Sequence, residues 1–195
     1  GLKALNLHEN DELIDVEVIS EDQPMIIGTH NGYALSFKSS VVRSMGRSAA
    51  GVRGIRLRDE DYVIGAAPLN SDSKVLVISE NGFGKQTPAS EYPIKGRGGL
   101  GVKTVNVTAK NGPLVGLTTV NGDEDIMLVT DQGVIIRFGI ESVSQTGRSA
   151  VGVHLIKLDN GARVATIAKV DKEVDEETEE ATNNSSQEES QPTEN

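Results

Sequence analysis

The chain has 195 residues, no cysteine and a formal net charge of −10 at pH 7. The absence of cysteine excludes disulfides and cysteine-ligated zinc, and it is typical of a reducing compartment. No apolar run approaches the length of a membrane span, and the first residues have no signal-peptide pattern. We therefore expect a cytoplasmic protein.

The acidic charge is concentrated at the C-terminal end. Residues 171–195 hold ten acids and one lysine, whereas the other 170 residues hold 19 acids and 18 bases. The end segment is rich in Glu, Ser, Asn and Gln, and it has almost nothing apolar after Val174. Such a composition predicts a disordered acidic tail over 171–195. The part over 1–170 is nearly neutral, so its capacity to bind nucleic acid has to be judged separately.

A repeat of about fifty residues runs through 1–170. Its opening motif is a glycine followed by alternating apolar and polar residues, and it begins at Gly1, Gly51, Gly101 and Gly152. Each of the first three units closes on a Gly-Arg pair followed by small residues. We predict one domain over 1–170, with repeats over 1–50, 51–100, 101–151 and, in part, 152–170.

The elements within a unit are predicted to be strands. The opening motif, for example 55–57, has the period-two pattern of a half-buried strand. At mid-repeat, two apolar runs flank Asn31-Gly32, Asn81-Gly82 or Gln132-Gly133. Asn-Gly between such runs predicts a β-hairpin, because both turn positions tolerate positive φ. No window has convincing helical periodicity, so we predict an all-β, propeller-like array of four-stranded blades.

Gly96 to Gly101 matches the G-x-G-x-x-G pattern of dinucleotide-binding folds. That function requires a helix directly after the glycines. Residues 102–107 predict a strand instead. We interpret the segment as a tight connection between strands that presents backbone amides and Arg97.

Acidic clusters at 9–12, 59–61 and 123–125 invite comparison with calcium sites. The first two occupy a place where later units carry Asn111-Gly112 and Asn160-Gly161, so we interpret them as turn formers. The histidines have no ligand spacing: His8, His30 and His154. We expect neither a metal site nor catalytic residues in this chain.

Basic residues recur at equivalent places of the repeat and form three columns. The first column is the arginine of each Gly-Arg pair: Arg47, Arg97 and Arg148. The second follows each opening apolar residue: Lys3, Arg53, Lys103 and His154. The third is mixed: Asn6, Arg56, Asn106 and Lys157. Further basic residues lie around these columns: Lys38, Arg43, Lys85, Lys95 and Arg137.

Two interpretations of the columns are open. Single basic residues are usually solvated, and a Gly-Arg arginine can brace a turn by binding carbonyl groups. In a stack of equivalent blades, however, one basic position becomes a row, which is an electrostatic track for a polyanion. Only six Tyr and Phe residues are present, too few for the stacking platforms of single-strand binders. We therefore predict phosphate contacts to duplex DNA.

Three segments resemble the C-terminal domain of DNA gyrase A: Met45–Leu57, Glu80–Pro88 and Glu91–Gly101. The resemblance implies a six-bladed β-pinwheel whose blades exchange strands and whose basic rim bends duplex DNA. This chain would hold about the last three and a half blades of a longer protein. The implied holoenzyme is a bacterial, nucleoid-associated type II topoisomerase that introduces negative supercoils and contains gyrase B and a second copy of gyrase A. Its ATP, Mg²⁺ and active-site residues lie outside this chain.

The chain departs from the family pattern in one motif, because the Gln-Arg-Arg-Gly-Gly-Lys-Gly box of the first blade is absent. Two alternatives to a DNA-wrapping gyrase domain stay open. One is a propeller-like scaffold for protein partners, and the other is the corresponding C-terminal domain of topoisomerase IV. For the tail over 171–195, we hypothesise competition with DNA for the basic rim, the alternative being a solubilising role.

Overall fold

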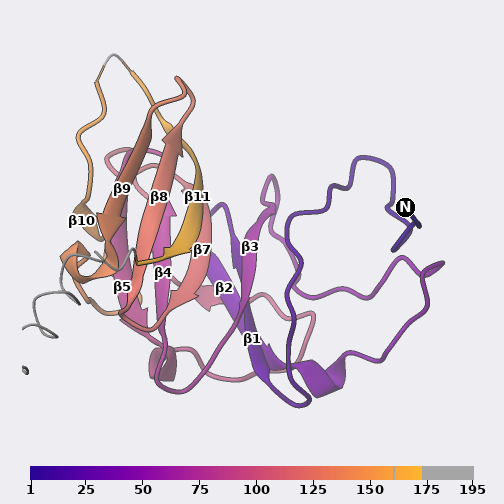
Figure 1. The fold of residues 1–195 in the computed structure, drawn as a ribbon. Coiled ribbons are helices and arrows are strands. Elements are labelled where there is room, and N and C mark those ends of the chain that lie inside the picture. The colour runs from indigo at the N-terminus through magenta and orange to yellow at the C-terminus, as the bar shows by residue number, and fades with distance from the viewer. Residues whose placement is uncertain (160, 173–195) are drawn as a thin grey trace, which may run out of the picture.

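The computed structural model describes residues 1–159 and 161–172. The predicted acidic tail lies outside the described residues from position 173 onwards. The described part is all-β, as predicted, and its helical content is limited to three 3₁₀ turns, η1 (Ser39–Val41), η2 (Ala89–Glu91) and η3 (Ile140–Ser142). Its strands form three antiparallel sheets that stand side by side (Figure 1).

The first sheet, called blade A, combines strands from three successive repeats. Its strands are β1 (Pro24–Thr29), β2 (Tyr33–Lys38), β3 (Val63–Pro68) and β6 (Val102–Lys103). The order across the sheet is β3-β1-β2-β6. The first repeat therefore supplies the central hairpin, the second repeat one edge strand and the third repeat the other.

Blade B repeats this arrangement one unit later. Its strands are β4 (Lys74–Ser79), β5 (Phe83–Pro88), β7 (Leu114–Val120) and β10 (Val153–His154). The order is β10-β5-β4-β7. Blade C has the order β11-β8-β9 and consists of β8 (Glu124–Thr130), β9 (Ile135–Gly139) and β11 (Val164–Asp171). The exchange of strands between repeats agrees with the pinwheel that the resemblance implies.

The predicted hairpins are confirmed at all three mid-repeat positions. In blade A, Gly28 pairs with Ala34 across the turn at Asn31-Gly32. Gly32 has a φ of 84°, in the region that glycine adopts without steric cost. The hairpins of blades B and C turn in the same way, with positive φ at Gly82 and Gly133.

The prediction for the opening motifs is only partly correct. Residues 55–57 do not form a strand, and the strands of the later motifs cover just 102–103 and 153–154. The reason is that the chain leaves the sheet to pass around a hairpin turn. Both Thr104 and Val105, for example, donate their backbone N–H groups to the carbonyl of Gly32. The alternation of apolar and polar residues therefore continues through the opening motif, but the hydrogen-bond pairing between strands ends after two residues.

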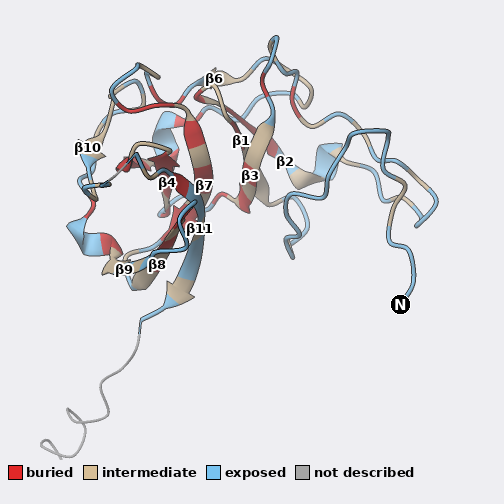
Figure 2. Ribbon diagram, turned by 90° about the horizontal axis from the view of Figure 1, so that it is seen from above, coloured by how far each residue is buried: buried red, intermediate tan, exposed pale blue. Residues whose placement is uncertain are grey.

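Hydrophobic cores lie between neighbouring blades. The core between blades A and B contains Ile26 and Val77, which are at most 1% exposed. The core between blades B and C contains Leu76, Ile78 and Leu128, all fully buried. Figure 2 shows this burial along the strands, whereas most of the N-terminal segment is exposed. Each blade is thus stabilised mainly by the blade next to it.

Glycines allow the inner strands of the blades to lie close together. A Cβ atom at Gly65 of β3 would lie 2.6 Å from the carbonyl oxygen of Leu117 in β7. A Cβ atom at Gly116 of β7 would lie 2.4 Å from the side chain of Ile167 in β11. We call β3, β7 and β11 the inner strands, and the opposite edge of each blade its outer edge.

We predict that Gly65→Ala destabilises the chain by about 1–3 kcal/mol, because the new methyl group meets backbone that cannot move without separating two blades. Gly46→Ala is the matched control, since a Cβ atom at Gly46 meets nothing within 4 Å. Urea denaturation followed by circular dichroism measures both free energies of unfolding. Equal stability of the two variants would contradict the close packing of β3 and β7.

Candidate nucleic-acid interface

Two of the three Gly-Arg segments lie on the outer edges of blades. We call 95–101 the second Gly-Arg loop and 146–152 the third. The backbone N–H of Lys95 donates to the carbonyl of Ser36 on β2, 2.8 Å away, and β6 then continues along the same strand. The third loop follows β5 in the same way, with Thr146 N–H donating to Gln86 at 2.9 Å. The repeat therefore places these loops in series along one side of the molecule.

The arginines of these two loops bind backbone carbonyl groups. Nη1 of Arg97 donates to the carbonyl of Arg53 at 2.6 Å, and Nη1 of Arg148 donates to that of Lys103 at 3.1 Å. Both side chains are half-buried. The alternative that these arginines brace the loops is therefore observed. A guanidinium has five N–H donors, so phosphate contact stays a prediction for both residues, as it does for the exposed Arg47.

The second and third columns present exposed basic side chains. Those of Lys3, Arg53 and Lys103 are all exposed, and so are Arg56 and Lys157. Lys103 and His154 occupy matching places, since each pairs with the aromatic residue that starts a blade's second hairpin strand. The structure thus puts Lys103 and His154 of the second column on equivalent outer strands of blades A and B. Contact of the columns with phosphate stays a prediction.

Two further predicted contacts have acidic partners. Nζ of Lys38 lies 2.7 Å from Oδ2 of Asp22, and hydrogen bonds from Lys38 and then Ser40 lower the pKa of that carboxyl group. Nε of Arg137 lies 2.8 Å from Oδ2 of Asp125. Their charges are partly compensated, so they contribute less to a positive surface. Arg43 and Lys95 are exposed.

The structure does not support the predicted phosphate contact of Lys85. Its side chain is fully buried in blade B. Its ammonium donates to the carbonyl groups of Gly147 at 2.7 Å and Arg148 at 2.5 Å. Burial lowers the pKa of Lys85 from 10.5 to about 8. The prediction for Lys85 is wrong because its place in the repeat is a buried one, as the aliphatic residues at the equivalent positions, Leu35 and Ile136, indicate.

Arg58 lies outside the three columns and was not predicted. Its guanidinium lies over the ring of Tyr33, 3.4 Å from the ring centroid, and Nη1 donates to the carbonyl of Leu100 at 2.8 Å. Arg58 therefore links the second Gly-Arg loop, at Leu100, to Tyr33 on β2. The residue does not recur, because the equivalent positions are His8, Thr108 and Asp159. No repeat pattern could have identified it.

The first two acidic clusters form turns, and one histidine is hydrogen-bonded to the backbone of strand β7. Positive φ at Asn10, Glu60, Gly112 and Gly161 confirms that the first two clusters form turns. Within the described residues, no three His, Asp or Glu side chains gather as metal ligands. Nδ1 of His30 is hydrogen-bonded to the carbonyl oxygen of Leu114, 2.9 Å away.

The G-x-G-x-x-G segment forms a loop followed by strand β6, as predicted. Gly101 has a φ of 71°, and a Cβ atom there would lie 2.6 Å from the carbonyl of Ala34. A glycine is therefore required at position 101 for the loop to approach the backbone of β2 closely. In the part of the chain that the structure describes, no helix is long and apolar enough to cross a membrane.

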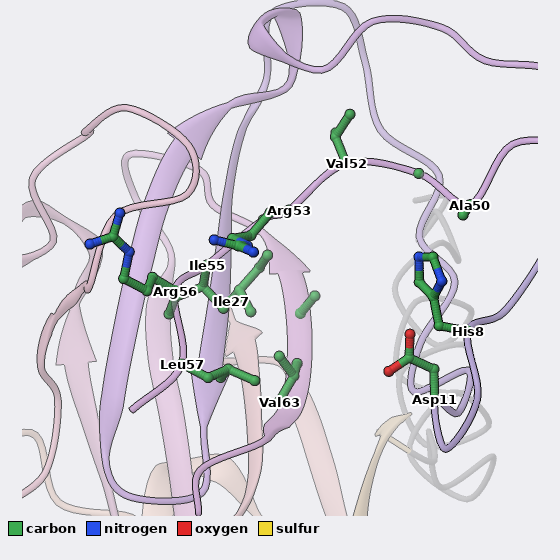
Figure 3. Close-up of a pocket in the computed structure, with 13 residues that line it drawn as sticks. His8, Asp11, Ile27, Ala50, Val52, Arg53, Ile55, Arg56, Leu57 and Val63 are labelled. Atoms are coloured by element: carbon green, nitrogen blue, oxygen red, sulfur yellow. The ribbon is translucent and has the colours of Figure 1, made fainter. Parts of the chain in front are cut away.

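A hollow of about 770 Å³ lies between blade A and the segments at 8–11 and 50–57 (Figure 3). Its wall includes Ile27, Ile55 and Val63 beside Arg53 and Arg56. The equivalent of Ile27 in blade B is Val77, which is 1% exposed because blade A covers it. We therefore interpret the hollow as an unpacked blade face with basic side chains at its border.

The comparisons with known proteins agree with the fold and the repeat. The family described as DNA gyrase C-terminal domain, beta-propeller, matches residues 1–20, 23–70, 73–121 and 124–171. The A subunit of DNA gyrase from Streptococcus pyogenes serotype M1 is 63% identical over 173 residues, which is 89% of this chain and 21% of that protein. The same subunit from Halalkalibacterium halodurans is 62% identical over 173 residues, again 89% and 21% of the two chains. The chain thus spans about a fifth of the length of these relatives.

Two solved structures have the same architecture. A DNA gyrase A C-terminal domain superposes with a TM-score of 0.80 at 27% identity, over 87% of this chain and 58% of that one. A C-terminal domain of DNA topoisomerase IV superposes with a TM-score of 0.82 at 25% identity, over 94% and 58%. Architecture alone does not separate the two enzymes, but the relatives above 60% identity are gyrase subunits. The chain belongs to the family of the DNA gyrase A C-terminal domain.

Proposed function

We propose that this chain binds duplex DNA along the outer edges of its blades and bends it around them. The observation that carries the proposal is the position of the Gly-Arg loops and of Lys103 on equivalent outer edges of successive blades. Basic groups repeated at the spacing of the blades form a track that a regular phosphate backbone can follow.

The energies involved set the number of contacts that such a surface needs. Bending a site of 20–30 base pairs by 40–90° costs on the order of 1–6 kcal/mol. Isolated contacts do not sustain such a bend, whereas a few exposed basic groups on each blade are of the right order. DNA recognition through phosphates also requires no aromatic platform, in agreement with the low aromatic content.

In the full-length protein, the bent DNA would be led to the site of strand passage with a fixed handedness. The relatives are A subunits of gyrase, so we propose the same setting for this chain: a type II topoisomerase with gyrase B and a second copy of gyrase A. ATP and Mg²⁺ would act elsewhere in that assembly, and its product would be negatively supercoiled DNA. We propose a bacterial cytoplasmic location.

We predict that Lys103→Ala changes the salt dependence of duplex binding. Each phosphate contact contributes about −0.9 to the slope of log affinity against log salt concentration, so the slope becomes shallower by about that amount. Lys169→Ala is the control, because Lys169 lies on the inner strand β11 and donates to Thr119. Fluorescence anisotropy with a 30-base-pair duplex measures both slopes. The same slope change in both variants would contradict a track on the outer edge, and a flat slope for the unmodified chain would favour the protein scaffold.

We predict that binding changes the linking number of circular DNA with one sign. A relaxed plasmid is incubated with the chain and a type I topoisomerase, and the products are separated by gel electrophoresis. Because the track follows one side of the blades, the shift grows with protein concentration and is reduced in the double variant Arg53→Ala/Lys103→Ala. Tight binding without any shift would mean that the DNA stays straight.

We predict that removal of 173–195 raises duplex affinity at low salt, because the acidic residues no longer compete for the basic rim. The gain shrinks as salt screens the tail. The control replaces every acid of 173–195 by its amide, Gln for Glu and Asn for Asp, so that length is retained. Equal affinity of all three forms would leave the tail with a solubilising role.

A further inference from the structure

Lys85 is a buried charge at a position where the other repeats carry aliphatic residues. It lies on β5, and its equivalents are Leu35 on β2 and Ile136 on β9. Leu35 is 1% exposed, so an aliphatic side chain fills this place in blade A without a charge. A buried ammonium is costly unless it is well paired. Packing alone therefore does not account for a lysine here.

The ammonium holds one short piece of backbone. Nζ of Lys85 donates to the carbonyl groups of Gly147 and Arg148, at 2.7 and 2.5 Å. On the other side of this backbone, Oε2 of Glu91 accepts the N–H group of Arg148 at 2.8 Å. Hydrogen bonds to charged groups are stronger than neutral ones. The third Gly-Arg loop is thus held at Arg148 by a cation and an anion.

The side chain of Arg148 extends this support to the next blade. Its Nη1 donates to the carbonyl of Lys103 on β6, the outer strand of blade A. Lys85 belongs to blade B, so a continuous series of contacts joins the two outer edges. In the second loop, Arg97 makes the same bond to Arg53, but Leu35 replaces the lysine. The bond between blades recurs, whereas the charged support occurs in the third loop.

We propose that Lys85 is a positioning residue that, with Glu91, holds Arg148 against blade A and so fixes the spacing of the basic groups that duplex DNA meets between blades A and B. The inference rests on the proposed binding of duplex DNA. Lys85 makes no phosphate contact itself, because its side chain has no exposed surface.

The charge of Lys85 gives the proposal a pH dependence. Burial, opposed by Glu91 and reinforced by Arg148, lowers the pKa of Lys85 to about 8. The amine is therefore mostly charged at pH 7 and mostly neutral at pH 9.5. A neutral amine keeps N–H donors but loses the charge that strengthens its two bonds. Tyr92, next to Glu91, stays neutral in this range because burial raises its pKa.

A double-mutant cycle on the 195-residue chain tests the proposal, with Lys85→Leu, Arg148→Ala and both together. Duplex affinity is measured by fluorescence anisotropy at fixed salt and in a salt titration. Lys85→Leu should weaken binding about three- to tenfold with an unchanged salt slope, and it should have no further effect in the Arg148→Ala background. Between pH 7 and 9.5, the unmodified chain should lose more affinity than Lys85→Leu does.

Lys85→Met, which keeps an unbranched side chain only one atom shorter than lysine, should behave as Lys85→Leu does, and circular dichroism establishes that both variants fold. Lys103→Ala serves as the reference for a lost phosphate contact. A slope shallower by about 0.9 in Lys85→Leu, a loss that adds to that of Arg148→Ala, or unchanged affinity would overturn the proposal alone. Absence of duplex binding by the unmodified chain at low salt would overturn the proposed function and this inference together.

Discussion

The pairing of strands across repeats is the constraint on which the rest of this structure depends. The hairpins of the first two repeats lack partners at both of their edges, and the next two repeats supply them, whereas the described part of blade C gains one added strand, β11. Blade A is complete only because β3 and β6 arrive from the second and third units. Backbone hydrogen bonds that are lost to water must be regained within the sheet, so no repeat is stable alone. The same pairing places the second Gly-Arg loop beside β2 and the third Gly-Arg loop beside β5.

The inner and outer edges of the blades are built by different physics. The inner strands approach closely because glycines such as Gly65 leave room for neighbouring backbone. The outer edges are joined by guanidinium groups, as Arg97 and Arg148 bind carbonyls of the preceding outer segments. These arginines use part of their hydrogen-bonding capacity on the protein. The side chains of Arg53 and Lys103 are more exposed and therefore carry more of the positive charge at the surface of these edges.

Much of the fold could be predicted from residue patterns, and less of the interface could. The turns at Asn31-Gly32 and its equivalents were predictable because glycine adopts positive φ without the steric cost that other residues meet there. Burial of individual basic residues was not, because alternation places a side chain on one face of a strand without saying what covers that face. For this reason the sequence predicts a surface position for Lys85, whereas in the structure its ammonium is bound beneath the third Gly-Arg loop. Arg58 could not be predicted, because it does not recur and the interface was inferred from recurrence.

The sequence by itself determined the all-β class, the fifty-residue period, the hairpins and the recurrence of basic residues, because these are local properties of backbone preference and spacing. Only the tertiary structure decided which repeat completes which blade, since strand partners fifty or a hundred residues away compete on equal terms in a repetitive chain. It also decided that Arg97 and Arg148 join neighbouring outer edges and that Lys85 is a buried support. The physical reason is that burial and hydrogen-bond partners are properties of the assembled surface, and a residue's position in the repeat does not contain them.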